Sequence, residues 1–109
     1  MDTKNPLDPL VRFGHALSDP TRVQILEILR KRPAYPADMV SELSMTKQSI
    51  SNHLACLRGC GLVIAKSEGR RTLYALADER IKHALDDLRQ IVLSTDPNAC
   101  DDANEKGCC

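Results

Sequence analysis

The chain has 109 residues, with 15 basic and 15 acidic side chains, no tryptophan, two tyrosines and one phenylalanine. That length predicts one domain with a modest core, and the shortage of aromatic residues favours packed helices over a β-sandwich. No apolar leader and no run of about 18 apolar residues is present, which argues against secretion and membrane insertion, so we expect a cytoplasmic protein.

Two helices are expected first. Asp8 is the expected N-cap of a short helix that has Pro9 at its first position and an apolar stripe on one face. The segment "SDPTRVQILEILRKRP" repeats this start with Asp19 as the cap, carries a wide apolar face and ends in basic residues before Pro33. It predicts a second helix.

A helix-turn-helix follows. "YPADMVSEL" has Pro36 at the first position of a short helix, and "SMTKQSISNHLACLRGCGL" predicts a second helix capped by Thr46 and ended by Gly59 or Gly61. At about 100° per residue, one side of this second helix is apolar and the opposite side is polar. Two helices joined by a tight turn are typical of DNA-binding proteins.

A hairpin, a last helix and a tail complete the chain. Two β-prone runs, 62–66 and 72–76, surround a Gly-containing turn and predict a basic β-hairpin. An amphipathic helix follows from its expected cap at Asp78 through the segment "ADERIKHALDDLRQIVLS". We therefore expect a mainly α winged helix-turn-helix over residues 1–95, dimerising through its first and last helices, and a flexible acidic tail over 96–109.

The charges are unevenly distributed although they sum to zero. Residues 1–93 contain 14 basic and 11 acidic residues, whereas residues 94–109 contain one basic and four acidic residues. A local basic stripe binds phosphates whatever the net charge, so we expect double-stranded operator DNA as a partner. The expected DNA-binding residues are Thr46, Lys47, Gln48, Ser49, Ser51, Asn52, His53, Arg70 and Arg71. The alternative for each is an ordinary solvated surface.

Five cysteines are the other unusual feature. Cys56 and Cys60 are four residues apart on the same predicted helix, close enough to share one soft metal ion, but two thiolates make an incomplete site. Cys100 lies seven residues beyond Leu93, a span of up to about 25 Å when extended, and is the candidate third ligand. Buried, inert cysteines are the alternative reading.

The histidines do not suggest catalysis. His53 lies one turn before Cys56, but no third orienting group is evident, so we do not expect an enzyme. His15 and His83 are read as lone structural histidines of two other helices.

Three segments, "LSDPTRVQILEILR", "SISNHLACLRGCGLV" and "EGRRTLYAL", resemble the ArsR/SmtB family of metal-responsive winged-helix repressors over residues 7–95. "SNHLACLRGCGLV", followed by "YALAD" and a tail cysteine, is similar to the cadmium- and lead-sensing branch. The resemblance implies a homodimer that binds its operator without metal and releases it with metal. It also implies Cd²⁺ or Pb²⁺ bound by Cys56, Cys60 and Cys100. Cys108 and Cys109 lie beyond that triad and leave open an additional donor, with As(III) or Zn²⁺ as alternative effectors.

Two other functions remain open. The same fold could sense oxidation through its thiols, although cysteines four apart in an intact helix are poorly placed for an unstrained disulfide. A metal buffer or thiol enzyme would need neither the arginines of the hairpin nor the amphipathic last helix. Specific, salt-dependent DNA binding would exclude both.

Overall fold

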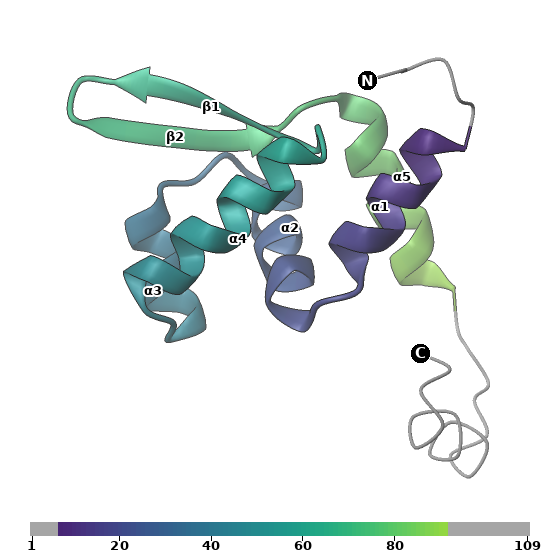
Figure 1. Ribbon diagram of the computed structural model, residues 1–109, viewed down its shortest axis with the longest axis horizontal. Coiled ribbons are helices and arrows are strands. Elements are labelled where there is room, and N and C mark those ends of the chain that lie inside the picture. Colours follow the sequence, from purple (N-terminus) through teal and green to yellow (C-terminus); the bar gives the residue numbers. More distant parts are fainter. Residues whose placement is uncertain (1–6, 92–109) are drawn as a thin grey trace, which may run out of the picture.

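Five helices and a two-stranded antiparallel hairpin make up residues 7–91, the part of the chain that the computed structural model describes (Figure 1). This arrangement confirms the expected mainly α fold with a small hairpin. Within the described residues, no helix is long and apolar enough to cross a membrane. In chain order the elements are α1 (Asp8–Leu17), α2 (Pro20–Lys31), α3 (Pro36–Leu43), α4 (Lys47–Gly59), β1 (Val63–Glu68), β2 (Arg71–Leu76) and α5 (Glu79–Gln90).

Two helices begin where short local signals place them. Asp19 caps α2 by accepting a hydrogen bond of 3.0 Å from the backbone N–H of Arg22, and Pro20 starts the helix. Thr46 caps α4 in the same way through the N–H of Ser49, at 3.0 Å. These caps satisfy amide groups that a helix start leaves without partners, so they define where each helix begins.

The first and last helices differ from the expected boundaries. Leu7, with helical φ and ψ of −86° and −14°, is the N-cap of α1, so Asp8 lies inside the first turn and instead binds Arg12 at 2.7 Å. The last helix, α5, ends at Gln90 because Ile91 has left the helical region, with φ −73° and ψ 121°. The expected continuation toward residue 94 is therefore wrong at Ile91, and later positions lie outside the described residues.

The core lies around α2, which contacts all four other helices and β2. Its side chains Ile25 and Leu26 have no exposed surface. The expected apolar side of α4 is confirmed, because Ile50, Leu54 and Leu57 are all buried to within 1%. Fixing this side of α4 against α2 also fixes which side of the helix faces solvent.

The hairpin is longer than the sequence indicates. Its register pairs Val63 with Leu76 at one end and Glu68 with Arg71 at the other, which leaves only Gly69 and Arg70 in the turn. Gly69 has φ +64°, a left-handed conformation that favours glycine. Arg71, which lies outside the two β-prone runs, is therefore a strand residue. Figure 1 shows the hairpin extending away from α1 and α5.

An extra backbone contact ties the hairpin to the helices. Ala34, between α2 and α3, forms an isolated antiparallel bridge with Tyr74 of β2. The two residues exchange N–H to carbonyl bonds of 2.9 and 2.8 Å. The hairpin is thus held at its middle by the helix-turn-helix unit as well as at its ends.

Candidate nucleic-acid interface and thiol pair

The polar face of α4 is open to solvent. Lys47, Gln48, Ser51 and Asn52 are all exposed, on the opposite side of the helix from its buried leucines. The amide of Gln48 donates a 3.0 Å hydrogen bond to the side-chain oxygen of Asn52, one turn later. Side-chain amides can bond base edges in pairs, and the ammonium group beside a helix N-terminus favours phosphate. This face has the chemistry of a DNA-reading surface.

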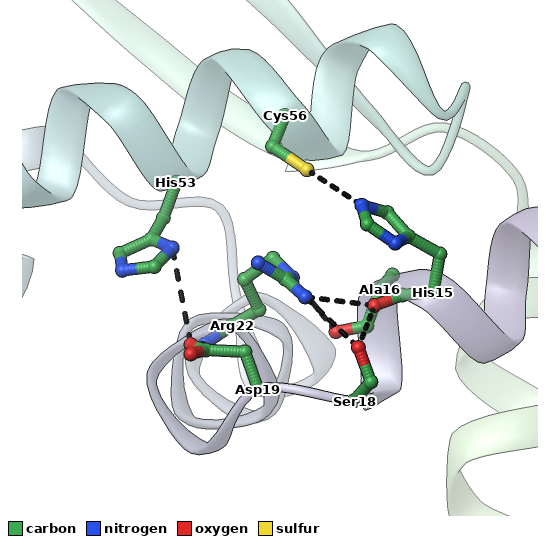
Figure 2. A network of polar contacts seen from close by, with 7 residues as sticks. All are labelled: His15, Ala16, Ser18, Asp19, Arg22, His53 and Cys56. Carbon is green, nitrogen blue, oxygen red and sulfur yellow. Dashed lines mark hydrogen bonds and ion pairs between the residues drawn. The ribbon is translucent and has the colours of Figure 1, made fainter.

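Three of the expected DNA-binding residues of α4 have other contacts. The Thr46 hydroxyl caps the helix by accepting from the N–H of Ser49, whose side chain is half-buried. His53 is also half-buried, and its Nδ1 lies 3.9 Å from a carboxylate oxygen of Asp19 (Figure 2). The structure therefore turns His53 toward the start of α2 and away from the exposed face. Helical spacing alone did not distinguish these two sides.

The two wing arginines have different surroundings. Arg70 is exposed at the tip of the hairpin. Arg71 stacks on Tyr35, with its guanidinium carbon 3.5 Å from the ring centre, a cation–π contact. The Tyr35 hydroxyl donates to Glu68, and this hydrogen bond raises the pKa of the phenol above its usual value. Lys47 and the two arginines line a cleft of about 310 Å³ between α3, α4 and the hairpin.

Cys56, in α4, and Cys60, the C-cap residue that directly follows α4, lie on a third side of the helix. Cys56 and Cys60 are both free and half-buried. Burial raises the pKa of the Cys60 thiol, and the neighbouring Cys56 adds to this through its charge and a side-chain hydrogen bond. Arg12 and Arg22 act in the opposite direction, because nearby positive charge favours a thiolate. The pair is therefore partly shielded, with two cations nearby.

A histidine missed by the sequence analysis contacts this pair. Nε2 of His15, in the last turn of α1, lies 3.6 Å from Sγ of Cys56 (Figure 2). The two residues are 41 positions apart. Helical periodicity relates positions within one helix, so it carries no signal for a contact between α1 and α4. His15, read as a lone histidine, is thus part of the thiol cluster.

A polar network surrounds this contact where α1 joins α2 (Figure 2). The guanidinium of Arg22 donates to the backbone oxygens of His15 and Ala16, at 2.8 and 3.1 Å, and to the Ser18 hydroxyl at 3.1 Å. The backbone N–H of Arg22 binds Asp19, which in turn faces His53 on α4. Arg22 therefore connects the end of α1, the cap of α2 and, through Asp19, α4.

The described residues do not by themselves enclose a metal ion. Among residues 7–91, no group of three or more histidine, cysteine or acidic side chains is arranged to hold one. The expected third ligand, Cys100, and the extra donors Cys108 and Cys109 lie outside the described residues. The pair Cys56 and Cys60 nevertheless fits a soft metal ion in donor chemistry, since both are free thiols of one helix face.

An apolar surface crosses α1 and α5. A groove of about 420 Å³ lies between these helices, and its lining is almost entirely apolar. Its residues are Leu10, Phe13, Gly14, Leu17, Ala84, Asp87 and Leu88. Three large apolar side chains on this surface are exposed to solvent: Leu10 is 69% exposed, Val11 67% and Leu88 47%. A surface of this kind is typical of a protein interface.

Comparison with known proteins agrees with this architecture. The family model described as "Bacterial regulatory protein, arsR family" matches residues 19–65. The transcriptional regulator CmtR of Mycobacterium tuberculosis is 51% identical over 87 residues, which cover 80% of this chain and 74% of that protein.

Two solved structures are similar. The NMR structure of the M. tuberculosis cadmium metal-sensor CMTR superposes with a TM-score of 0.66 at 50% identity, covering 80% of this chain and 90% of that one. A homodimeric winged helix-turn-helix DNA-binding domain from Mycobacterium bovis gives a TM-score of 0.72 at 28% identity, covering 82% and 87%. The exposed face of α4, the hairpin and these similarities together establish that the chain is a winged helix-turn-helix member of the arsR family of bacterial regulatory proteins.

Proposed function

We propose that this regulator is a metal-responsive repressor, whose metal-free dimer binds operator DNA and whose metal-bound form releases it. One observation carries the proposal: the free thiols Cys56 and Cys60 lie on the same helix that exposes an amide- and hydroxyl-rich face. A ligand at the thiols can therefore act directly on the DNA-reading element. The similarity to a protein described as a cadmium metal-sensor supports a metal effector.

In this proposal α4 enters the major groove. Gln48 and Asn52 bond base edges, while Lys47 and the helix N-terminus hold phosphate. Arg70, at the tip of the wing, contacts a flanking phosphate or the minor groove. Arg71 has a supporting role, because its stacking on Tyr35 keeps the wing beside α3.

The effector is a soft, thiophilic ion. Cys56 and Cys60 supply two thiolates and Cys100 the third, from the same subunit or its partner. A set of three thiolates suits Cd²⁺ or Pb²⁺, with As(III) or Zn²⁺ as alternatives, and Cys108 and Cys109 as further donors. Ligation would bring Asp101 and Asp102 toward a helix that meets phosphate, so both their negative charge and the constraint on α4 would oppose DNA binding.

The second copy would cover the apolar groove of α1 and α5. Exposed apolar side chains on both helices line or flank this groove, and a similar domain from M. bovis is described as homodimeric. A twofold dimer presents two copies of α4, which suits two half-sites one helical turn apart.

The test is fluorescence anisotropy of the full-length dimer on a labelled fragment of its own upstream DNA. We expect Cd²⁺ or Pb²⁺ to weaken binding by about 5- to 150-fold, the usual range of allosteric coupling, and a chelator to restore it. Cys56→Ser, Cys60→Ser and Cys100→Ser should bind DNA normally but lose the response. Release by an oxidant that a reductant reverses, with no metal response, would instead establish the thiol redox alternative.

A further inference from the structure

We propose that His15 supplies a nitrogen ligand to the metal ion held by Cys56 and Cys60, so that the site bridges α1 and α4. The inference rests on the proposed function and extends its ligand set from sulfur alone to sulfur and nitrogen. The observation behind it is the contact between Nε2 of His15 and Sγ of Cys56, at 3.6 Å.

The separation of these two atoms fits ligation of one ion. In tetrahedral zinc sites the metal lies about 2.3 Å from sulfur and about 2.0 to 2.1 Å from nitrogen. At a tetrahedral angle, those bond lengths place the sulfur and nitrogen about 3.5 to 3.6 Å apart. Cys56 and His15 therefore already have the spacing of two ligands, before any ion is bound.

The position of His15 is fixed by its backbone. Its carbonyl oxygen accepts hydrogen bonds from Arg22 at 2.8 Å and from the hydroxyl and N–H of Ser18, at 2.6 and 3.2 Å (Figure 2). The next residue, Ala16, is completely buried. The backbone that carries the imidazole is thus held at three points, while the ring itself remains exposed and open to an ion from solvent.

Metal binding requires thiolate sulfur and a neutral imidazole. Burial and the neighbouring Cys56 raise the pKa of the Cys60 thiol, and the positive charges of Arg12 and Arg22 oppose this only in part, so the metal must displace a thiol proton. Ligation requires a neutral imidazole with its proton on Nδ1 and a free electron pair on Nε2, the nitrogen that faces sulfur. Binding then forms metal–sulfur and metal–nitrogen bonds and releases the thiol protons to solvent.

Such a ligand would change what the metal controls. The thiols belong to the recognition helix, whereas His15 belongs to α1, one of the two helices that form the apolar groove. Arg12 of α1 already donates a 3.1 Å hydrogen bond to the carbonyl of Gly59, in the last turn of α4. A metal bond between the same helices would fix the orientation of α4 relative to the dimer, in addition to any effect of Cys100.

The decisive experiment is NMR of the full-length protein with ¹⁵N-labelled histidine, titrated with ¹¹³Cd²⁺. We expect one ring nitrogen, Nε2 of His15, to shift and to show a one-bond coupling to cadmium. The ring nitrogens of His53 and His83 should show no coupling to cadmium. Their silence would assign the coupled resonance to His15. His15→Gln should lose the coupled resonance and weaken cadmium affinity by about tenfold or more. His83→Gln, on the exposed side of α5, is the matched control and should change neither.

The result also separates this inference from the proposed function. If Cys56→Ser abolishes cadmium binding but no histidine nitrogen couples to cadmium, the metal site stands and His15 is only a hydrogen-bond partner of the thiol. If Cys56→Ser and Cys60→Ser bind cadmium as well as the parent, the proposed metal site itself is wrong. Metal-free DNA affinity equal to the parent's shows that His15→Gln is folded.

Discussion

Asp19 has several partners in the polar network. Its carboxylate accepts the N–H of Arg22 at the start of α2 and lies 3.9 Å from the His53 ring. The backbone hydrogen bond from Arg22 is the main cause that holds the pKa of Asp19 below its ordinary value of 3.8, and the charge of His53 acts in the same direction. The ionised carboxylate is therefore favoured by the folded state.

This pKa predicts how stability depends on pH. Because the folded-state pKa is depressed, Asp19 stabilises the protein at pH above about 3.8, and the stabilisation is lost as pH falls through the lower folded value. Asp19→Asn keeps a capping oxygen but does not titrate. We expect the parent to exceed Asp19→Asn in urea midpoint at neutral pH and to lose that advantage in acid. A difference that stays constant with pH would contradict this, and Glu79→Gln, an exposed carboxylate outside the apolar groove, is the control.

The contact between His15 and Cys56 could not be predicted from the sequence, although the thiol pair itself could. The thiol pair was predictable, because four-residue spacing on one helix places two side chains together. The third member was not, because it comes from another helix and is positioned by packing and by the bonds of Arg22 to backbone oxygens. His53 was misjudged for a related reason: at its position on α4 the neighbouring helix, and not solvent, decides what the side chain faces.

At the scale of elements, α4 combines three sides with different roles. Its buried side packs against α2. A substitution that removes packing there should therefore lower the free energy of unfolding directly, without removing any side chain of the exposed face. We expect Leu54→Ala, at a position 1% exposed, to lower the free energy of unfolding by about 2 to 5 kcal/mol. Ile64→Ala, at a strand position 53% exposed, is the comparison and should change it by at most about 0.5 kcal/mol. Chemical denaturation measures both, and equal losses would mean that α4 is not part of the core.

The wing provides a second prediction at this scale. Arg70 is exposed at the tip, whereas Arg71 stacks on Tyr35. Arg70→Gln should therefore weaken operator binding and reduce the slope of log affinity against log salt by about 1, with no change in stability. Arg71→Gln should lower stability through the lost stacking. Anisotropy at several salt concentrations, with thermal unfolding of the same samples, distinguishes the two residues. The reverse pattern would assign the phosphate contact to Arg71.

Element starts were more predictable than element lengths. The caps Asp19 and Thr46 act within three residues, so the sequence alone locates the starts of α2 and α4. The hairpin extends to Glu68 and Arg71 because those residues pair across the turn and both contact Tyr35, a residue more than 30 positions away. Such contacts depend on the assembled fold, and strand propensity does not report them.

For the whole molecule, the apolar groove of α1 and α5 is the surface that we propose a second copy covers. Leu10, 69% exposed, lies in this groove. Placing a charge there would desolvate it on dimerisation, so we expect Leu10→Glu to shift the protein toward monomers and to weaken operator binding. Sedimentation velocity measures the first effect and anisotropy the second. Ile64→Glu, an exposed apolar position on the wing, should leave the mass unchanged; an unchanged dimer for Leu10→Glu would place the interface elsewhere.

The bridge between Ala34 and Tyr74 has a consequence for how the molecule opens. Two hydrogen bonds of 2.9 and 2.8 Å join the short link between α2 and α3 to the outer edge of β2, so that Ala34 pairs with the hairpin as a third strand would. An isolated two-stranded hairpin is marginal in water, and its amides would normally exchange with solvent deuterons by local fraying. Here the amides of Ala34 and Tyr74 should exchange together, and only when the wing and the helix-turn-helix separate. The wing should in this sense unfold as one cooperative unit with α2 and α3.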